Sequence, residues 1–547
     1  MKNFLMVLLL FPILSFTQSK RKIRLAEEKA NTEMVANLTA HIQYLADDKL
    51  EGRRTGSKGE ELAMQYIINQ YKQMGLEPKA VNGYIQEFEV NEGKQIDVTT
   101  ILKVDNKSLQ LTTEFIPLAF SAQQTVKGFP AIALSEAHQP WFKDLKDLLE
   151  ENKSNQKFDV EEEVKKMVTA VIAKGATALF IYNSSTLTDN LQFNKNDKTI
   201  AVSIPVVYIT KEGFQKYFSD NTASLGIELN IKFSDKKRTG KNVIGFIDNQ
   251  AANTVILGAH YDHLGYGEDK TALDTGHFIH NGADDNASGT AALIELARKL
   301  KKNAPKNNNY LILNFSGEEL GLLGSKYWLE NPSTTITPNY MINMDMVGRY
   351  DTAHKLTIGG YGTSPVWSGI FAAEKNNLLI KFDSTGSGPS DHASFYRKDI
   401  PVLFLFTGSH SDYHKATDDW NKINFTAEKD IVNLVYRVVT ATNSKGKLPF
   451  TKTNDPQPGG SRAFRVSLGV MPDYGFSGTG MRIDGVSPGK LAEKAGLQAG
   501  DVLLQLGEYK FVDVKSYGEV LSKFNKGDKA KLRIKRGAEE KEFDIVF

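Results

Sequence analysis

The chain has 547 residues, and at about 150 residues per domain this length predicts about three to four domains. Lys and Arg number 67 against 65 Asp and Glu, so the formal charge of +2 provides no bulk electrostatic field to favour nucleic acid or an anionic membrane. The chain contains no cysteine, which excludes disulfides, thiolate nucleophiles, iron–sulfur clusters and Cys-based zinc sites. Any metal must therefore be held by His, Asp and Glu.

The first predicted element is a secretory signal peptide at residues 1–18. Lys2 precedes an apolar run from Phe4 to Phe16, and polar residues follow it. This run is too short for a membrane-spanning helix, which needs about 20 residues, so a retained anchor is the weaker alternative. We expect an exported protein, periplasmic or secreted, with no stable membrane insertion after signal cleavage.

After the signal, residues 32–75 predict two amphipathic helices. Apolar residues recur there at helical spacing, namely Met34, Leu38, Ile42 and Leu45, then Ala63, Tyr66, Ile67, Tyr71 and Met74. A charged loop with glycines joins them from Asp47 to Ser57. Further along, a middle region predicts a helix at 160–174 and apolar strands at 179–182 and 206–209.

From Lys241 onward, buried strands alternate with helices. Strands are expected at 255–257, 310–315, 340–344 and 402–406, and helices at 290–300 and 319–329. This alternation is typical of an α/β domain with a mostly parallel sheet. Such sheets bind ligands at the carboxyl ends of their strands, so the residues after each strand are candidates for a site.

Carboxylate and imidazole side chains follow these predicted strands. Eight of the ten histidines lie between His260 and His414. The candidate residues are His260, Asp262, Asp285, Glu318, Glu319, Asp345 and His414. Their nitrogen and oxygen donors suit Zn²⁺ or a similar divalent ion.

Two metal ions fit these candidates better than one. Glu318 and Glu319 would repel each other if unpaired, whereas a two-ion site uses one carboxylate as a ligand and leaves the other for proton transfer. For any single motif, a solvated loop charge or a helix-capping acid is an equal explanation. Because the motifs recur after several apolar strands, we favour the metal site.

Five motifs resemble those of the co-catalytic dizinc peptidases, which include secreted bacterial aminopeptidases, aminopeptidase Y and glutamate carboxypeptidase. They are His260-x-Asp262, Gly282-Ala-Asp-Asp285-Asn-Ala-Ser-Gly289, Ser316-Gly-Glu318-Glu319-x-Gly321, Asn343-Met-Asp345 and Tyr413-His414. The early stretch Leu50-Glu-Gly-Arg53-x-x-Gly56 is also similar to that family's N-terminal helix pair. The resemblance implies a three-layer α/β zinc-peptidase fold with a mostly parallel central sheet.

The resemblance also implies two Zn²⁺ ions per chain. The implied ligands are Asp285 as the bridge, His260 and Asp345 at one ion, and Glu319 and His414 at the other. Glu318 would be the general base that accepts a proton from the attacking water. Asp262 would orient His260 through its far ring nitrogen, as is common at metal-bound imidazoles.

Other residues near these motifs have less definite roles. Tyr413 is either a donor to the tetrahedral oxyanion or a packing residue, and the two roles are about equally supported. Asp284 is expected to hydrogen-bond within its loop, and Ser390-Asp391-His392 to support the pocket. Five further histidines are expected to be structural or to contact ligands rather than metal: His263, His277, His280, His392 and His410.

Two accessory units are predicted around the peptidase domain, which is expected to span residues 19–114 and 235–448. In the insert at 115–234, the stretches Ala173-Lys-Gly175-Ala-Thr-Ala178 and Ile204-Pro-Val-Val-Tyr-Ile209 resemble a protease-associated (PA) domain, the alternative being an uncharacterised α/β insert. A Pro/Gly-rich linker follows at 449–462. Beyond it, Val486-Ser487-Pro488-Gly489 and the run Ala492–Asp501 make residues 463–547 resemble a PDZ domain of bacterial proteases. Its Leu468, Gly469 and Val470 would bind the C-terminus of a peptide or protein, unless this PDZ domain is purely structural.

The favoured function is an exported zinc-dependent aminopeptidase acting on peptide substrates. A carboxypeptidase or dipeptidase of the same fold remains open, because it would need a basic residue for the substrate carboxylate that the sequence does not locate. A non-catalytic, receptor-like peptide-binding protein would be expected to have broken ligand positions, whereas every one here carries a competent residue. Cyclisation of N-terminal glutamine by a one-zinc relative is disfavoured by the complete two-metal set.

Overall fold

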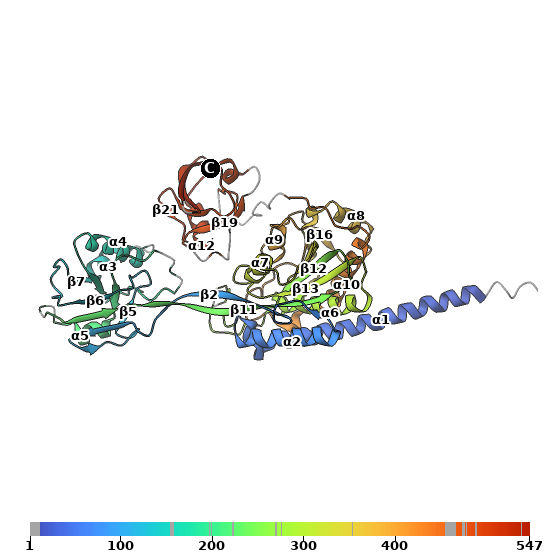
Figure 1. The fold of residues 1–547 in the computed structure, drawn as a ribbon, viewed down its shortest axis with the longest axis horizontal. Coiled ribbons are helices and arrows are strands. Elements are labelled where there is room, and N and C mark those ends of the chain that lie inside the picture. The colour runs from blue at the N-terminus through green and yellow to red at the C-terminus, as the bar shows by residue number, and fades with distance from the viewer. Residues whose placement is uncertain are drawn as a thin grey trace, which may run out of the picture.

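The computed structural model contains a large α/β unit, a region of small sheets and a C-terminal unit (Figure 1). The structure describes residues 11–153, 158–195, 197, 200–220, 222, 224–268, 271–274, 276–352, 354–453, 466–472, 476, 479–486, 490–512, 514–537 and 539–547. Much of the predicted signal peptide (1–10) and of the predicted linker (454–462) lies outside the described residues. Among the helices of the described part, none is both long and apolar enough to cross a lipid bilayer.

The α/β unit is built on one sheet, to which nine strands belong within the described residues. The strands are β1 (Glu77–Pro78), β2 (Ile85–Ile96), β11 (Phe233–Ile247), β12 (Asn253–His260), β13 (Asn308–Phe315), β14 (Pro338–Met344), β15 (Leu356–Gly359), β16 (Ile380–Phe382) and β17 (Val402–Phe406). Their order is β1-β11-β13-β12-β14-β17-β15-β16, with β2 also paired to β11. The four central strands β13, β12, β14 and β17 are parallel, and antiparallel pairs flank them. The expected α/β fold with a mostly parallel centre is confirmed.

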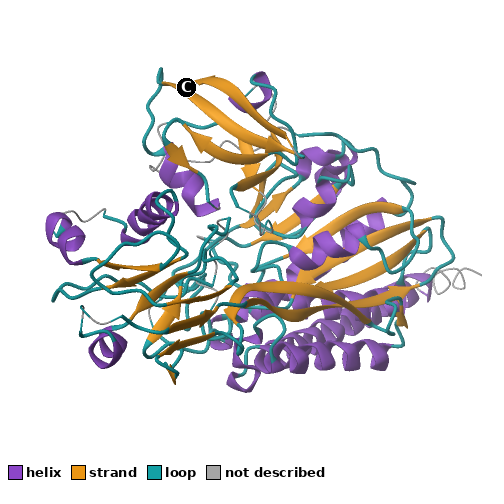
Figure 2. Ribbon diagram, turned by 60° about the vertical axis from the view of Figure 1, so that its left-hand side comes forward, coloured by secondary structure: helices purple, strands orange, loops and turns teal. Residues whose placement is uncertain are grey.

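Helices cover both faces of this sheet (Figure 2). Alternate residues of a strand point to opposite faces, and both sets are apolar here: Val255 and Leu257 belong to one core, and Ile256 to the other. The first core includes residues of α1 (Phe11–Leu45), α2 (Lys58–Met74), α6 (Gly289–Asn303), α8 (Val366–Ala373) and α10 (Phe425–Thr442). The second includes residues of α7 (Leu323–Glu330) and α9 (His392–Tyr396). The result is three layers, helix, sheet and helix.

One helix begins later than the sequence predicts. The expected helix at 319–329 starts at Leu323, because the preceding residues form tight turns. Gly321 N–H donates to the Glu318 carbonyl at 2.8 Å, and Leu323 N–H donates to the Gly317 carbonyl at 2.9 Å. Gly317 has a φ of +68°, which favours glycine. Glu318 and Glu319 therefore lie in a turn that directly follows β13.

The long antiparallel ribbon of β2 and β11 leads from the large sheet to two small sheets (Figure 1). One has the order β4-β3-β10-β6, made of Lys107–Ser108, Ile101–Val104, Ile227–Asn230 and Thr125–Gly128. The other has the order β5-β9-β8-β7, made of Phe115–Pro117, Val206–Ile209, Ala178–Tyr182 and Pro140–Asp144. Three helices accompany them, α3 (Lys146–Asn152), α4 (Val160–Ile172) and α5 (Lys211–Tyr217). These sheets have apolar cores of their own.

The C-terminal unit also has its own apolar core. Its sheet has the order β18-β19-β20-β22-β23, with β21 paired to β20. The strands are β18 (Val470–Pro472), β19 (Met481–Val486), β20 (Val502–Leu506), β21 (Tyr509–Lys510), β22 (Lys529–Arg536) and β23 (Glu539–Val546), and the helices are α11 (Leu491–Lys494) and α12 (Val514–Leu521). The predicted domain limits remain predictions.

Candidate metal centre

The parallel strands bring the predicted residues to one edge of the sheet. His260 ends β12 and is level with Phe315, the last residue of β13, which Glu318 and Glu319 follow. Asp345 comes directly after β14, which pairs in parallel with β12 on its other side. Because these strands run in the same direction, their carboxyl ends meet, as the sequence predicted.

One cluster joins an imidazole to two carboxylates. His260 Nε2 lies 3.4 Å from Asp285 Oδ1 and 3.3 Å from Asp345 Oδ1. His260 is 1% exposed. Its other ring nitrogen, Nδ1, faces the main-chain carbonyl of Asp262 at 3.2 Å. An Nδ1–H donated to that carbonyl leaves the Nε2 lone pair directed at the two carboxylates.

A second cluster uses the other oxygen of Asp285. His414 Nε2 lies 3.3 Å from Asp285 Oδ2 and 3.2 Å from Glu319 Oε2. His414 Nδ1 donates to the Thr271 carbonyl at 2.9 Å, so Nε2 is the ring nitrogen that faces the two carboxylates. Asp285 thus lies between the clusters and offers one oxygen to each.

The loop that carries Asp285 is held by main-chain hydrogen bonds. Its residues Ala283–Ser288 lie directly ahead of α6, and the backbone at Asp285 and Asn286 is not helical. Asp284 and Asp285 each donate their N–H to Asp418 Oδ2, at 2.9 and 3.0 Å. Gly282 opens the loop with a φ of +53°, and a Cβ there would lie 2.0 Å from the Asp285 carbonyl oxygen. This position therefore requires glycine.

Asp284 has the structural role expected from the sequence. Its Oδ1 accepts the N–H of Gly348 at 2.7 Å, and its Oδ2 faces His410 Nε2 at 3.1 Å. These contacts tie the Asp285 loop to the segments after β14 and β17.

Arg53 lies fully buried behind the centre. Its Nε donates to the Tyr261 carbonyl at 2.9 Å, and its Nη1 and Nη2 donate to the carbonyls of Asn281 and Gly282 at 2.6 and 3.0 Å. Nη1 also donates to Leu45 at the end of α1. Burial lowers the Arg53 pKa to about 10, although nearby carboxylates, Asp285 first among them, oppose this. The guanidinium remains charged and joins α1 to two of the loops that form the site.

Burial and charge set the protonation of the second cluster. Burial and the charge of Asp285 act to raise the Glu319 pKa, but His414 and His263 outweigh them and lower it to about 2. Burial acts to lower the His414 pKa, but Glu319 and Asp285 raise it to about 11. The imidazole therefore holds a proton where the carboxylates converge, and a bound cation would take the place of that proton.

Glu318 lies beside this charge cluster. Burial raises the pKa of Glu318 well above its usual range; the charges of Asp345 and Glu319 add to this, while His260 opposes it. Its main-chain N–H donates to Asp262 Oδ1 at 3.2 Å. Asp262 Oδ2 accepts the Thr55 hydroxyl at 2.9 Å. The Asp262 carboxylate lies 3.7 Å from His260 Nδ1, which is farther than the 3.2 Å from its Oδ1 to the main-chain N of Glu318. The carboxylate therefore supports the Glu318 turn rather than the imidazole.

Tyr413 packs its ring against that of His414, with ring centroids 3.9 Å apart and planes 23° apart. Burial and the surrounding carboxylates raise the pKa of Tyr413. The phenol therefore stays protonated at neutral pH and keeps a hydrogen to donate. This geometry is compatible with both roles expected from the sequence.

Several neighbours of the centre contact its proposed ligands, and of these only His263 was expected from the sequence to do so. His263 Nδ1 lies 2.8 Å from Glu319 Oε1, and the atoms of His263, Asp285 and Glu319 that could bind metal lie within 4.8 Å of one another. Two further neighbours are the Thr271 carbonyl, which accepts a hydrogen bond from His414, and the Asp418 carboxylate, which accepts two from the loop that carries Asp285. Asp418 comes four residues after His414 in the sequence, whereas no sequence pattern identifies the Thr271 carbonyl.

The other histidines lie among structural contacts. His280 Nε2 faces Asp274 Oδ1 at 2.8 Å, and His277 stacks on Tyr266. His392 stacks on Phe404, and burial lowers the His392 pKa to about 3, so the imidazole is neutral. The hydroxyl of its neighbour Ser390 accepts a hydrogen bond from Asn343 at 2.8 Å, a contact with the end of β14.

The three predicted PDZ residues lie at the start of the C-terminal sheet. Gly469 has a φ of +76° and donates its N–H to Ser467 Oγ at 3.1 Å. The Leu468 carbonyl accepts the N–H of Ala492 at 2.8 Å, and Val470 begins β18.

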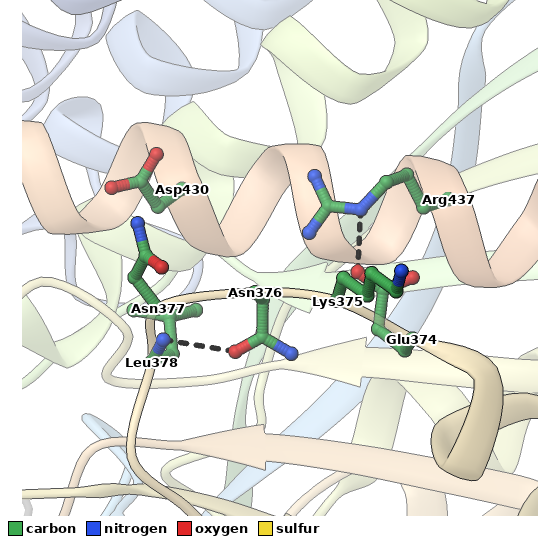
Figure 3. A pocket seen from close by; sticks show the side chains of 7 residues that line it. All are labelled: Glu374, Lys375, Asn376, Asn377, Leu378, Asp430 and Arg437. Carbon is green, nitrogen blue, oxygen red and sulfur yellow. Dashed lines mark hydrogen bonds and ion pairs between the residues drawn. The ribbon is translucent and has the colours of Figure 1, made fainter.

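A separate cavity of about 450 Å³ lies at the surface between the loop 374–378 and α10 (Figure 3). Its polar lining includes the ion pair of Arg437 Nε with Glu374 Oε1 at 2.6 Å. None of the predicted metal-binding residues lines it.

Comparisons with protein families match two parts of the chain. Residues 242–439 match the model of peptidase family M28. Residues 452–546 match the model of the PDZ domain.

Among curated proteins, aminopeptidase YwaD of Bacillus subtilis is 31% identical over 302 residues, which are 51% of this chain and 60% of the relative. Leupeptin-inactivating enzyme 1 of Streptomyces exfoliatus is 30% identical over 190 residues, 34% of this chain and 39% of the relative. The chain thus spans 60% of the length of the first relative and 39% of the second.

Among solved structures, an aminopeptidase from Aneurinibacillus sp. strain AM-1 is 20% identical, with a TM-score of 0.40, and the match covers 77% of this chain and 96% of that one. The zinc aminopeptidase BSAP from Bacillus subtilis is 20% identical, with a TM-score of 0.42, and the match covers 76% of this chain and 98% of that one.

Proposed function

The chain carries a peptidase family M28 domain and a PDZ domain, and from that premise we propose that it is an exported, zinc-dependent aminopeptidase. Hydrolysis of the N-terminal peptide bond is the proposed reaction. Of the two curated relatives described above, one is named an aminopeptidase and the other a leupeptin-inactivating enzyme.

The observation that supports this proposal most is the position of Asp285 between two imidazoles. Its Oδ1 faces His260 Nε2 at 3.4 Å, and its Oδ2 faces His414 Nε2 at 3.3 Å. One carboxylate that serves two otherwise separate ligand sets is the arrangement expected of a two-ion centre. The proposed ligands are His260, Asp285 and Asp345 for one ion and Asp285, Glu319 and His414 for the other.

The residues of the centre fit two zinc ions. Each set combines one imidazole with two carboxylates, which are typical zinc ligands, and leaves room for water or substrate. The hydrogen bonds at the far Nδ1 atoms of His260 and His414 direct both Nε2 lone pairs inward. Zinc bound there would supply Lewis acidity, which polarises a peptide carbonyl and lowers the pKa of water.

In the proposed mechanism, Glu318 accepts a proton from the attacking water and then donates it to the leaving amine. Its raised pKa makes it a stronger base than an exposed carboxylate, and its turn is held by the carboxylate of Asp262. Tyr413, which stays protonated, is placed beside His414 where it can donate to the oxyanion of the tetrahedral intermediate.

Export and the two accessory units are parts of the same proposal. The apolar segment near the N-terminus supports export. Relatives include a protein named probable lipoprotein aminopeptidase LpqL of Mycobacterium tuberculosis, 27% identical over 301 residues, 47% of this chain and 55% of the relative. We assign the PA-like insert a role in restricting substrate size, and Leu468, Gly469 and Val470 a role in binding peptide C-termini.

The test compares peptides that differ only in their N-terminus. The full-length protein is incubated with peptides carrying a free amine and with the same peptides acetylated, before and after treatment with a chelator. Release of the N-terminal residue from free-amine peptides alone, lost with the chelator and restored by zinc, is the expected result. Cleavage of the acetylated peptides would reject the aminopeptidase.

A further inference from the structure

One segment, from His263 to His280, contacts both outer ligands of the second cluster. His263 Nδ1 lies 2.8 Å from Glu319 Oε1, while Glu319 Oε2 faces His414. The His263 side chain is fully buried, so water does not compete for this contact. An Nδ1–H on the His263 ring donates one hydrogen to this carboxylate oxygen. Glu319 thus has one oxygen bound by protein and one directed at the centre.

The same segment holds His414 and the residues that follow it. The Thr271 carbonyl accepts a hydrogen bond from His414 Nδ1, and Leu273 N–H donates to the His414 carbonyl, each at 2.9 Å. Asp274 Oδ2 accepts the N–H of Ala416, also at 2.9 Å. Three hydrogen bonds with Thr271, Leu273 and Asp274 of this segment therefore hold the ring of His414 and the backbone at and after it.

Asp274 is in turn held by a buried histidine. Its other oxygen, Oδ1, faces His280 Nε2 at 2.8 Å, and His280 Nδ1 faces the Gly265 carbonyl at 3.3 Å. His280 is fully buried, so its contacts with Asp274 and with the Gly265 carbonyl hold the segment to the interior of the protein. Asp274 and His280 thus support the segment around His414, while His263 supports Glu319.

The first cluster has different supports. His260 Nδ1 faces the Asp262 carbonyl, and Asp345 N–H donates to the Leu405 carbonyl at 3.1 Å. Neither contact involves residues 264–280. The two clusters share Asp285, and Asp262 touches both, because its carbonyl faces His260 Nδ1 and its carboxylate accepts the N–H of Glu318; the remaining supports described above lie in different segments.

We propose that His263 and Asp274 are positioning residues for the ion held by Glu319 and His414, and that they set the affinity of this ion without setting that of the other. The inference rests on the proposed two-zinc function. Partners that fix the orientation of metal ligands typically change metal affinity by about 10- to 100-fold. The affinities of the two ions are thereby set by different residues.

The experiment is a zinc titration of the full-length, chelator-stripped protein against a competing chromophoric chelator, repeated with Co²⁺ to follow its absorption spectrum. His263→Leu removes the donor to Glu319. His263→Asn keeps an N–H near the position of Nδ1 and serves as the rescue variant. Asp274→Ala removes the acceptor for Ala416 at a partly exposed position, and His354→Leu is a matched control at an exposed histidine.

The expected result for His263→Leu and Asp274→Ala is an affinity about 10- to 100-fold lower for one ion only, with the other ion unchanged. His263→Asn should stay within about 3-fold of the unmodified protein, and His354→Leu should match it. Three outcomes would overturn the inference. They are an equal loss of affinity for both ions, an unchanged affinity for both, and a loss of affinity in His263→Asn as large as that in His263→Leu. Because the readout is metal binding, two bound ions without peptide hydrolysis would reject the proposed function and leave this inference standing.

Discussion

The main-chain N–H of Glu318 donates a hydrogen bond to the carboxylate of Asp262 at 3.2 Å. This contact links the turn after β13 to the residue that follows β12 by two positions. It holds the proposed base in place without engaging its side chain, which remains free to accept a proton.

Replacing Asp262 should reduce turnover more than it reduces substrate binding. Asp262→Ala removes the acceptor for Glu318 N–H and for the Thr55 hydroxyl, so the turn that carries Glu318 loses its support. We expect kcat to fall by about 10- to 100-fold with KM changed by less than about 3-fold. Steady-state kinetics on a free-amine peptide provides the measurement. Thr55→Val, which keeps the Asp262–Glu318 contact, should have the smaller effect, and a larger effect would contradict this assignment.

Replacing the shared carboxylate, Asp285, should weaken the binding of both ions. Asp285→Ala removes the oxygen that faces His260 and the oxygen that faces His414, whereas His414→Ala leaves the first cluster complete. At limiting zinc, we expect His414→Ala to retain one ion per chain and Asp285→Ala to retain almost none. Elemental analysis after gel filtration measures the ratio. Asp285→Ala protein that retains one tightly bound ion would argue against a shared ligand.

Arg53 should matter for stability more than any exposed arginine. Arg53→Met leaves four carbonyl groups without their donor and removes a buried positive charge from beside several carboxylates. We expect a loss of about 3 kcal/mol or more in the free energy of unfolding, measured by urea denaturation.

Two further variants provide comparisons for the free energy of unfolding of Arg53→Met. Arg53→Lys should not restore stability, because a single ammonium cannot reach carbonyl acceptors set at guanidinium spacing. Arg24→Met, at an exposed position on α1, should change stability by less than about 0.5 kcal/mol. Equal losses for Arg24→Met and Arg53→Met would contradict the role given to Arg53.

The metal-free protein should have a narrow pH range of greatest stability. The Glu319 pKa is lowered from 4.5 to about 2, so its contribution is present above about pH 4.5 and is lost as the pH falls toward 2. The His414 pKa is raised from 6.5 to about 11, so its contribution is present below about pH 6.5 and is lost as the pH rises toward 11. The melting temperature should therefore decline on both sides of pH 4.5 to 6.5.

Added zinc should change how the melting temperature depends on pH. Zinc requires a neutral imidazole and ionised carboxylates, so the increase in melting temperature on adding zinc should grow between pH 6.5 and 9. Calorimetric scans with and without zinc give both profiles. A metal-free melting temperature that rises steadily from pH 6.5 to 9 would contradict the proton-holding cluster described here.

The sequence was sufficient to predict the four central parallel strands of the large sheet and the residues at their carboxyl ends. His260, Glu318, Glu319 and Asp345 come directly after apolar strands, and parallel pairing then brings them to one edge. Short-range pattern and sheet geometry together determine that part of the centre. The role of each residue at a metal ion remains a prediction that the experiments above address.

The supports of the centre could not be predicted in the same way. Arg53 reaches loops more than 200 residues away, and His263 lies on Glu319 because two different strands end side by side. Such contacts depend on how loops close over the sheet edge, which no local periodicity reports. The late start of α7 has a similar cause, since Gly317 permits a turn that helical spacing alone does not reveal.

The central claim is that Glu318 transfers a proton at a centre that other residues build. The most direct measurement determines bound zinc and peptide turnover on the same sample of Glu318→Gln protein. We predict that this variant retains two zinc ions per chain, as the unmodified protein does, and that its kcat falls by at least about 100-fold. Two bound zinc ions with nearly unchanged turnover would contradict the account.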